Sequence, residues 1–329
     1  MKKLFFNLLK IGIPLVLGIF AIQYELNQLS EEEKYQLLQS IKSANPVFLL
    51  LSGILGFVSH ISRSIRWKYT LEPLGYHPQL KNSFNSIMLS YFVNIFIPRG
   101  GELTRSVVLF KTENVPPSKS FGTVVTERIA DLFCLCLIIG LVLLIEGEKL
   151  SQILGEKLGS KKPGLDIIYG IIGIFLLFLL GNALLNRWKE RRFFKKLFQI
   201  KEGLFHGALS IFKMKNAWAY LGHSLFIWTC YALMHYFCFL SIPELSNAGI
   251  GPVLASFVVG GITLIVISGG LGVYPTAIKD TLVAFGFLSI PAYALGWVIW
   301  ITQTLMMIIG GIYSGISFLF FSKKSNENH

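Results

Sequence analysis

The feature that most constrains this chain is a series of apolar segments, each about twenty residues long, which recur from one end to the other. In lipid, backbone hydrogen bonding permits only helices or closed barrels, and unbroken runs of this length are too long for barrel strands. Hydrophobic residues make up 53% of the 329 positions and charged residues 15%, whereas a soluble chain carries about 25% charge. We therefore predict an all-α polytopic membrane protein that forms a single transmembrane domain over residues 1–329.

The net charge of +12 is distributed in a way that indicates membrane topology. Lys and Arg gather at 63–68, 186–201 and 323–324, and each group lies beside an apolar segment. This placement is typical of cytoplasmic loops that face anionic lipid. We therefore expect membrane lipids with anionic head groups as partners, and no nucleic acid.

Six apolar segments have the length of full crossings, and two shorter stretches suit the membrane surface. The crossings are predicted at about 4–22, 46–65, 119–145, 166–186, 217–241 and 290–321. The first has a basic start but lacks a small-x-small cleavage site, so we interpret it as a retained span. Ser30 and Glu33 have capping-box spacing and predict an interfacial helix over about 30–44. Residues 187–215 mix basic residues with Phe and Leu, which favours an amphipathic surface helix, with binding of a partner protein as the alternative.

Two further apolar segments, 83–111 and 248–288, contain helix breakers near residues 100 and 270. If each segment enters and leaves on one side, and the two enter from opposite sides, every basic loop and both termini lie in the cytoplasm. The fold then has about six full transmembrane helices plus two opposed re-entrant hairpins, roughly eight hydrophobic segments in all. Paired breaks of this kind are typical of transporters built from inverted repeats, so a repeat with halves 1–165 and 166–329 is a hypothesis.

Charged residues lie in apolar surroundings just after the first break and in the next span. They are Arg99, Glu102, Arg105, Glu127, Arg128 and Asp131. The first three step by three residues, and Glu127 and Asp131 are four apart, so each set shares a helix face. Asp131 lies about 18 Å along the helix from Lys119, near the bilayer midplane. A lone charge there costs roughly 2.5–3.5 kcal/mol, so these groups must be paired or hydrated.

Two interpretations of these charges remain open. One is a neutral salt-bridge cluster that fixes the first hairpin to the next span. The other is a binding site for an anionic ligand, because the guanidinium fork matches phosphate oxygens. Gly100 and Gly101 would let backbone N–H groups approach such an anion at the start of a helix.

The second break repeats part of this chemistry. Its small residues are Ser268, Gly269, Gly270 and Gly272, and Pro275 follows at a position favoured in a first helical turn. Lys279 and Asp280 come one turn later. We interpret the break as a second broken helix directed at the same cavity; a Gly-rich helix-packing contact is the alternative.

Other polar residues are expected to be structural. Arg63, Arg66 and Trp67 are predicted to anchor the end of the second span at the interface. His223 and His235 lack metal-ligand spacing, and we interpret the four cysteines as small apolar residues that pack within helices. We therefore expect no metal, no cofactor and no catalytic residue.

Four blocks of this sequence resemble, in order, those of the lysylphosphatidylglycerol synthase transmembrane-domain family. They are "SIRWKYTLEPLG", "NIFIPRGGELTRSVVL", "TVVTERIADL" and "SGGLGVYP". The resemblance implies a bacterial-type cytoplasmic-membrane protein that moves or handles a lipid with an anionic or modified head group. The positions of this sequence that match the family's motifs, and that the resemblance therefore implies as site residues, are Arg99, Gly100, Gly101, Glu102, Arg105, Glu127, Arg128, Asp131, Gly269, Gly270 and Gly272. The position after "GGLGVY" is often acidic in the family but is Pro275 here, which leaves Asp280 as the nearest carboxylate.

These features together predict a lipid flippase or transporter rather than an enzyme. Two-domain members of the family carry an aminoacyl-transferase domain after the membrane part, and no such domain follows here, so this chain is not expected to perform that synthesis. The alternative is a membrane-embedded transferase that acts on a lipid-linked substrate. A third hypothesis is a scaffold that recruits a partner through 187–215. As a protein partner we expect either a second copy of the chain, in a homo-oligomer, or a separate lipid-modifying enzyme.

Overall fold

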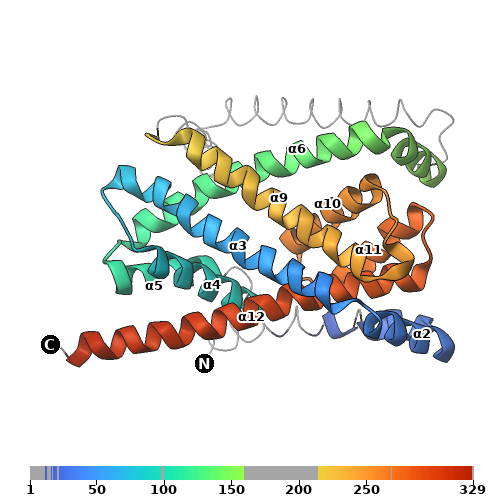
Figure 1. Ribbon diagram of the computed structural model, residues 1–329, viewed down its shortest axis with the longest axis horizontal. Helices are drawn as coiled ribbons and strands as arrows, with labels where there is room; N and C mark the ends of the chain where they lie inside the picture. Colours follow the sequence, from blue (N-terminus) through green and yellow to red (C-terminus); the bar gives the residue numbers. More distant parts are fainter. Residues whose placement is uncertain are drawn as a thin grey trace, which may run out of the picture.

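The computed structural model describes residues 12, 16, 18–20, 22–97, 100–158, 214–267 and 269–327. Within these ranges the chain is helical and has no β-strand. The expected crossing at 166–186 and nearly all of the expected helix at 187–215 lie outside the described residues. The helices are α2 (Glu31–Lys42), α3 (Pro46–Leu71), η1 (Glu72–Leu74), α4 (Leu80–Phe96), α5 (Gly100–Glu113), α6 (Pro117–Leu158), α9 (Ala217–Ser241), η2 (Pro243–Leu245), α10 (Ile250–Val266), α11 (Val273–Ala284) and α12 (Ser289–Glu327) (Figure 1).

Four of the described helices are long and apolar enough to cross a membrane. The apolar spans are Pro46–Leu74, Pro117–Leu150, Ala217–Ser241 and Ser289–Phe320. They coincide with four of the crossings predicted from sequence, and α9 has the predicted bounds. The protein is thus a multi-pass membrane protein built from helices. Of the first predicted crossing, only residues 12, 16, 18–20 and 22 are described, and they are helical.

The two Gly/Pro-interrupted segments form pairs of shorter helices. In the first pair α4 has 17 residues and α5 has 14; in the second, α10 has 17 and α11 has 12. None reaches the length of about 20 residues that a perpendicular crossing needs. The chain leaves helical geometry between the members of each pair, and at the second break Gly269 and Gly270 have φ of +80° and +61°, which side chains other than glycine rarely adopt.

The two breaks have the same local geometry. Helix α4 ends at Ile97 with φ −121° and ψ 102°, and α10 ends at Ile267 with φ −115° and ψ 101°. Each isoleucine N–H donates to the carbonyl four residues earlier at 2.8 Å, and each isoleucine carbonyl accepts from the glycine three residues later at 3.0 Å. The starts of α4 and α10 are 170 residues apart.

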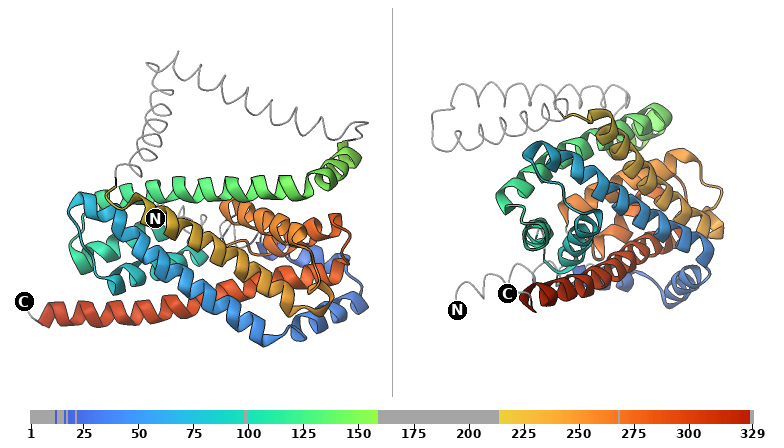
Figure 2. Two further views of the ribbon diagram at one scale, coloured as in Figure 1. Left: turned by 45° about the horizontal axis from the view of Figure 1, so that its top comes forward. Right: turned by 60° about the vertical axis from the view of Figure 1, so that its left-hand side comes forward.

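This similarity extends to the order of the helices. A long helix, a 3₁₀ turn, a 17-residue helix, a short helix and a second long helix occur once over 46–158 and again over 217–327. The two leading helices, α3 and α9, pack closely and run antiparallel (Figures 1 and 2). Their ends are joined by Asn45 N–H donating to Ser241 O at 2.8 Å, and about two turns further along by Ser52 Oγ donating to Met234 O at 3.1 Å. The halves also interlock, because α4 packs on α12 and α10 packs on α6.

A helix is present where one was predicted at 30–44, and it is α2. The Ser30 side chain accepts from the Glu33 N–H, and the Glu33 carboxylate accepts from the Ser30 N–H, so both halves of the capping box are present. Helix α2 packs on α12, and its Leu37 joins the largest apolar core cluster, which includes Phe239, Tyr274 and Leu295.

Candidate functional site: a buried cluster of arginines and carboxylates

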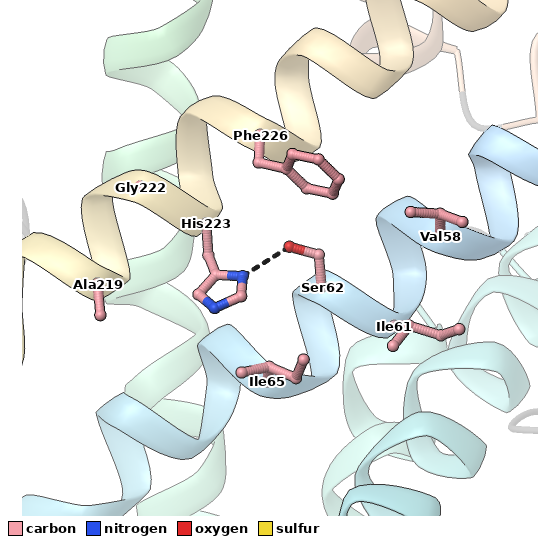
Figure 3. Close-up of a pocket in the computed structure, with 8 residues that line it drawn as sticks. All are labelled: Val58, Ile61, Ser62, Ile65, Ala219, Gly222, His223 and Phe226. Carbon is pink, nitrogen blue, oxygen red and sulfur yellow. Dashed lines mark hydrogen bonds between the residues drawn. The ribbon is translucent and has the colours of Figure 1, made fainter.

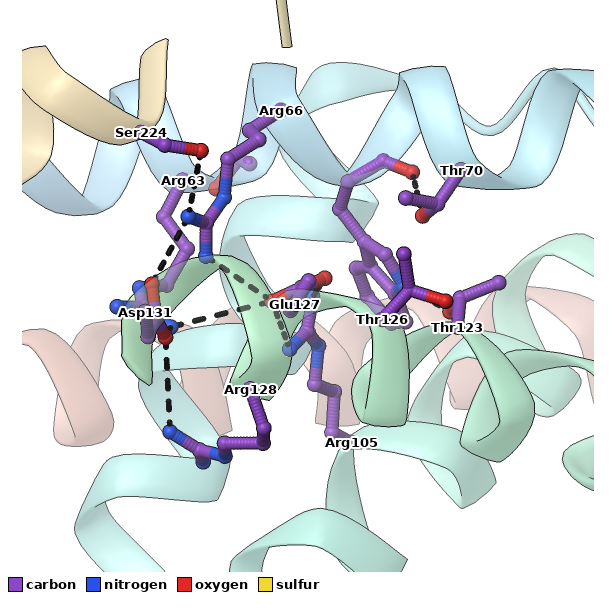
Figure 4. Close-up of polar contacts among 12 residues, drawn as sticks. Arg63, Arg66, Thr70, Arg105, Thr123, Thr126, Glu127, Arg128, Asp131 and Ser224 are labelled. Atoms are coloured by element: carbon purple, nitrogen blue, oxygen red, sulfur yellow. Dashed lines mark hydrogen bonds and ion pairs between the residues drawn. The ribbon is translucent and has the colours of Figure 1, made fainter. Parts of the chain in front are cut away.

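Five charged side chains meet inside the bundle, where α3, α5 and α6 approach one another (Figure 4). They are Arg63 and Arg66 from α3, Arg105 from α5, and Glu127 and Asp131 from α6, and all five are buried. We call this set the charged cluster. Each segment brings its charges to the interior because the opposite faces of these helices are apolar, so the polar face packs inward.

Arg105 and Glu127 form the most regular pair of the cluster. Arg105 Nη1 and Nη2 donate to Glu127 Oε2 and Oε1 at 3.0 and 2.7 Å, a two-pronged arrangement. The guanidinium also lies 3.5 Å from the ring centre of Trp67, and Trp67 Nε1 donates to Thr123 Oγ1 at 2.8 Å. Arg105 is therefore fixed between a carboxylate and an aromatic face.

Asp131 is the second acceptor of the cluster. Arg66 Nη1 donates to Asp131 Oδ1 at 2.9 Å, and Arg63 Nη1 donates to Oδ2 at 3.3 Å. The same Arg66 nitrogen donates to Ser224 Oγ at 3.0 Å, which ties α9 to the cluster. Both arginines of α3 also lie near Glu127, with N–O distances of 3.8 and 3.6 Å.

Positive charge exceeds negative charge inside the charged cluster. Three guanidiniums face two carboxylates, and the Nε atoms of all three arginines lack a hydrogen-bond partner among the described residues, as does Nη2 of Arg66. Buried donors are normally satisfied, and a buried unpaired charge is costly. The cluster therefore has both the charge and the free donors to accept one further anionic group.

A partly exposed ion pair borders the charged cluster. Arg128 Nη2 donates to Glu102 Oε1 at 3.1 Å, with exposed side-chain fractions of 52% and 29%. Arg128 Nη1 also lies 3.8 Å from Asp131 Oδ2, so the outer pair is continuous with the buried one (Figure 4). We call Arg128 and Glu102 the outer pair.

The expectation that Arg63, Arg66 and Trp67 anchor at the membrane interface is wrong. Their exposed fractions are 4%, 0% and 0%, and the two arginines bind carboxylates more than 60 residues away in the sequence. A lone cation at this depth would be expensive, but the carboxylates of α6 compensate it. One signal was available, because His60, Arg63 and Trp67 recur at helical spacing on one face of α3.

The predicted residues at the first break are placed as follows. Arg99 lies outside the described residues. Gly100 N–H donates to Ile97 O, and Gly101 N–H donates to Asn94 Oδ1 at 2.8 Å, so both amides already have partners. A Cβ at Gly101 would collide with Ser90 O and with Asn94, which shows that this glycine permits close packing of α5 on α4. Asn94 of α4, whose side chain caps the start of α5 by accepting from the Gly101 N–H, was not anticipated from sequence.

The predicted residues at the second break do not join the charged cluster in the described structure. Ser268 lies outside the described residues. Gly269 O accepts from Trp300 Nε1 at 2.7 Å, Gly270 N–H donates to Ile267 O, and a Cβ at Gly272 would lie 2.6 Å from Gly18 O. Gly269 also lies close to the first break, since a Cβ there would be 3.7 Å from Ile95 O.

Lys279 and Asp280 belong to a different ion-pair group. Lys279 Nζ donates to Glu25 Oε2 at 2.6 Å, lies 5.4 Å from the ring centre of Tyr293 and is 3.7 Å from Asp280. Asp280 is exposed, with a side-chain fraction of 67%. Helix α11, which carries both, lies at the opposite end of the bundle from α5 (Figure 1).

The remaining polar groups behave as structural elements. His223 Nδ1 is 2.8 Å from Ser62 Oγ, and His235 Nε2 is 2.9 Å from Ser256 Oγ, whereas His235 Nδ1 has no hydrogen-bond partner among the described residues. Among the described residues, His, Cys, Asp and Glu form no group that could hold a metal ion. The Ser62–His223 pair lies in an open, mainly apolar groove of about 480 Å³ between α3 and α9 (Figure 3). Its other lining residues are Val58, Ile61, Ile65, Ala219, Gly222 and Phe226.

The long apolar helices and the buried charged cluster define a multi-pass integral membrane protein with an ionic site inside its bundle. The chain belongs to the family described as the lysylphosphatidylglycerol synthase TM region, which matches residues 7–311. The resemblance inferred from the four sequence blocks is thus confirmed.

Three relatives, all archaeal, share parts of the chain. A UPF0104 membrane protein of Methanocaldococcus jannaschii is 33% identical over 29% of this chain and 30% of its own length. A UPF0104 membrane protein of Methanothermobacter thermautotrophicus is 24% identical over 40% of each chain. Glycosyltransferase AglD of Haloferax volcanii is 27% identical over 33% of this chain and 18% of its own length. The match therefore covers less than half of each relative, and no solved structure matches this chain.

Proposed function

We propose that this protein is a lipid transporter that moves an anionic lipid, such as a phospholipid or a polyprenyl-phosphate-linked lipid, across the membrane. The observation that carries the proposal is the charge imbalance of the charged cluster, in which three buried guanidiniums face two carboxylates. A phosphate group would supply the missing negative charge and accept from the free arginine donors.

The outer pair is the entry to this site. Arg128 is half exposed and Glu102 is partly exposed, so a head group reaches them without unfolding the bundle. A phosphate that binds Arg128 releases Glu102 and draws the anion toward Arg63 and Arg66, which share Asp131 with Arg128. The lipid tails stay in the bilayer, and the carboxylates rebind the arginines once the lipid leaves.

The proposed movement relies on the paired broken helices. The equal caps at Ile97 and Ile267 and the antiparallel α3 and α9 support an inverted repeat with two re-entrant hairpins that enter from opposite sides. Their breaks approach each other, since Gly269 lies near Ile95. We assign both termini to the cytoplasm, because the basic loops then lie inside. The sequence carries no ATP-binding motif, so an ion gradient or the lipid gradient itself drives transport.

A membrane-embedded transferase is the second candidate. The observation in its favour is the short similarity to a protein named glycosyltransferase, together with two carboxylates near a lipid site. Acid–base chemistry requires a carboxylate free to exchange a proton, whereas Glu127 and Asp131 each bind guanidiniums. A separate lipid-modifying enzyme or a second copy of the chain remains a proposed protein partner.

Reconstitution tests the transport function directly. The full chain is placed in vesicles that contain a fluorescent phospholipid with a single phosphodiester charge, and a membrane-impermeant quencher reports the fraction in the outer leaflet. We expect redistribution between leaflets with no change in lipid mass. Arg128→Gln should slow it at least tenfold, because it removes the accessible phosphate ligand.

Lys68→Gln is the matched control. Lys68 is 50% exposed and pairs with Glu72, which is 27% exposed, so it reproduces the exposure of the outer pair outside the charged cluster. It should transport at the rate of the unaltered protein. A lipid of altered mass would support the transferase, and equal rates for Arg128→Gln and Lys68→Gln would refute the assignment of the site.

A further inference from the structure

His60 is a buried polar residue for which the charged cluster provides no partner. It is 3% exposed, and neither ring nitrogen has a hydrogen-bond partner among the described residues. An unsatisfied buried polar group destabilises the folded state, so such groups are rare without a structural or ligand-binding reason. In contrast, the two other histidines in described helices, His223 and His235, each have a serine partner.

Aromatic residues from two other helices surround this imidazole. The Tyr91 ring of α4 lies 4.6 Å from the His60 ring, and the Tyr231 ring of α9 lies 6.4 Å away. Both tyrosines are partly exposed, whereas the ring nitrogens of His60 are buried. Trp228 packs on Tyr231 at 6.3 Å. We call His60, Tyr91 and Tyr231 the aromatic subsite.

The aromatic subsite is continuous with the charged cluster. Arg63, one turn from His60, donates to Tyr231 Oη at 3.3 Å and to Asp131 at 3.3 Å. Trp228 Nε1 donates to Asp131 Oδ1 at 3.4 Å. A ligand whose phosphate binds the arginines would therefore bring its next few atoms to His60.

The position of the subsite also suits a transport site. His60 lies near the middle of α3 and Tyr231 near the middle of α9. The two residues are 171 apart, as are the starts of their helices, so they occupy equivalent positions in two antiparallel helices that pack on each other. Transport sites in inverted repeats lie near the membrane midplane at the repeat interface.

The chemistry of the aromatic subsite selects among head groups. A neutral imidazole has one N–H donor and one nitrogen acceptor. A hydroxyl group can accept from the first or donate to the second, whereas an ionised phosphate oxygen can only accept. An ammonium group would lie beside Arg63 and be repelled. Aromatic rings add apolar contact for the carbon skeleton of a polyol or a sugar.

We infer that His60, with Tyr91 and Tyr231, is a specificity site for uncharged hydroxyl groups attached to the lipid phosphate. The substrate class is therefore an anionic phosphodiester lipid with a polyol or sugar head group. This inference rests on the proposed phosphate site, but it concerns selection among lipids of equal charge.

Competition binding tests the inference without any transport step. The purified full chain in detergent is given equal amounts of phosphatidylglycerol and phosphatidylpropanol with identical acyl chains, and native mass spectrometry measures the ratio bound. These probes carry the same charge and differ only in two hydroxyl groups. We expect about a tenfold preference for phosphatidylglycerol, which His60→Phe abolishes while total lipid binding remains.

His235→Phe is the matched control, because His235 is as deeply buried at 1% but hydrogen-bonds Ser256 away from the subsite. It should keep the preference. Tyr91→Phe retains the ring and removes a phenolic hydroxyl that, as donor and acceptor, would pair with a head-group hydroxyl beside His60. It should weaken the preference even if His60→Phe misfolds. Equal binding of the two probes by the unaltered chain, or an unchanged preference in Tyr91→Phe and His60→Phe, would overturn the inference. A preserved preference without transport in vesicles would instead refute only the transport function.

Discussion

The carboxylate of Glu127 accepts hydrogen bonds from both Nη atoms of Arg105, at 3.0 and 2.7 Å, although the two residues lie on different helices of a membrane-embedded bundle. The pair joins α5, which follows the first break and packs on α4, to α6. It also lies within 3.8 Å of Arg63 and 3.6 Å of Arg66. Glu127 thus has three arginine neighbours and is the central anion of the charged cluster.

Glu127→Gln should strongly destabilise the protein. The substitution leaves three buried guanidiniums with one carboxylate, and breaking a buried pair typically costs about 3–5 kcal/mol. The midpoint of thermal unfolding in detergent should fall clearly below that of the unaltered chain. Glu72→Gln is the control, because Glu72 pairs with Lys68 at the surface, where a pair contributes about 0–1 kcal/mol. Equal midpoints for the two variants would contradict the central role of Glu127.

Gly101→Ala should loosen the packing of α5 on α4. The new methyl group would collide with the backbone carbonyl of Ser90 and with Asn94, so α5 must move away from α4. We expect a lower unfolding midpoint and faster hydrogen exchange in residues 90–105. Gly122→Ala is the control, because a methyl group at this position meets nothing within 4 Å. Alanine also favours the helix more than glycine does within α6. It should leave the midpoint unchanged or raise it.

Trp300→Phe should release the second break. It keeps an aromatic ring in α12 but removes the N–H that binds Gly269 O at 2.7 Å, a hydrogen bond worth about 1 kcal/mol. Hydrogen exchange of the amides in residues 269–274 should accelerate several-fold. Trp218→Phe, at an 87% exposed position, should leave this exchange unaltered. Unchanged exchange in Trp300→Phe would show that the glycine backbone holds its geometry without this hydrogen bond.

The stability of the first turn of α2 should decrease at acid pH. Hydrogen bonds from the backbone and the hydroxyl of Ser30 lower the pKa of Glu33 from its ordinary value of 4.5. Since the pKa is depressed in the folded state, the stabilisation is present above 4.5 and is lost as the pH falls through the folded value. Hydrogen exchange at residues 31–34, corrected for intrinsic rates, should show fraying at pH 3 relative to pH 6.

Glu33→Gln is the control for this pH dependence. A glutamine accepts the same hydrogen bonds but does not titrate, so fraying should no longer differ between the two pH values. If both chains fray equally at pH 3, the carboxylate of Glu33 is not the group responsible.

The sequence by itself determined the elements of this protein. Hydrophobic length placed the four described spans, Pro98 with Gly100 and the glycines of 269–272 placed the two breaks, and the Ser30–Glu33 spacing placed α2. These properties depend on the cost of polar backbone in lipid and on local backbone freedom, which act over a few residues. The cluster members Arg105, Glu127 and Asp131 were likewise evident, because a charge within an apolar span requires compensation.

Only the tertiary structure decided which charges meet. Arg63 and Arg66 looked like interfacial anchors from their position near the end of a span, but the packing of α3 against α6 turns them toward Asp131. Lys279 appeared equivalent to the charges of the first hairpin, yet it pairs with Glu25. Such partners are distant in sequence, and their choice depends on how helices cross, which spacing along a single helix does not specify.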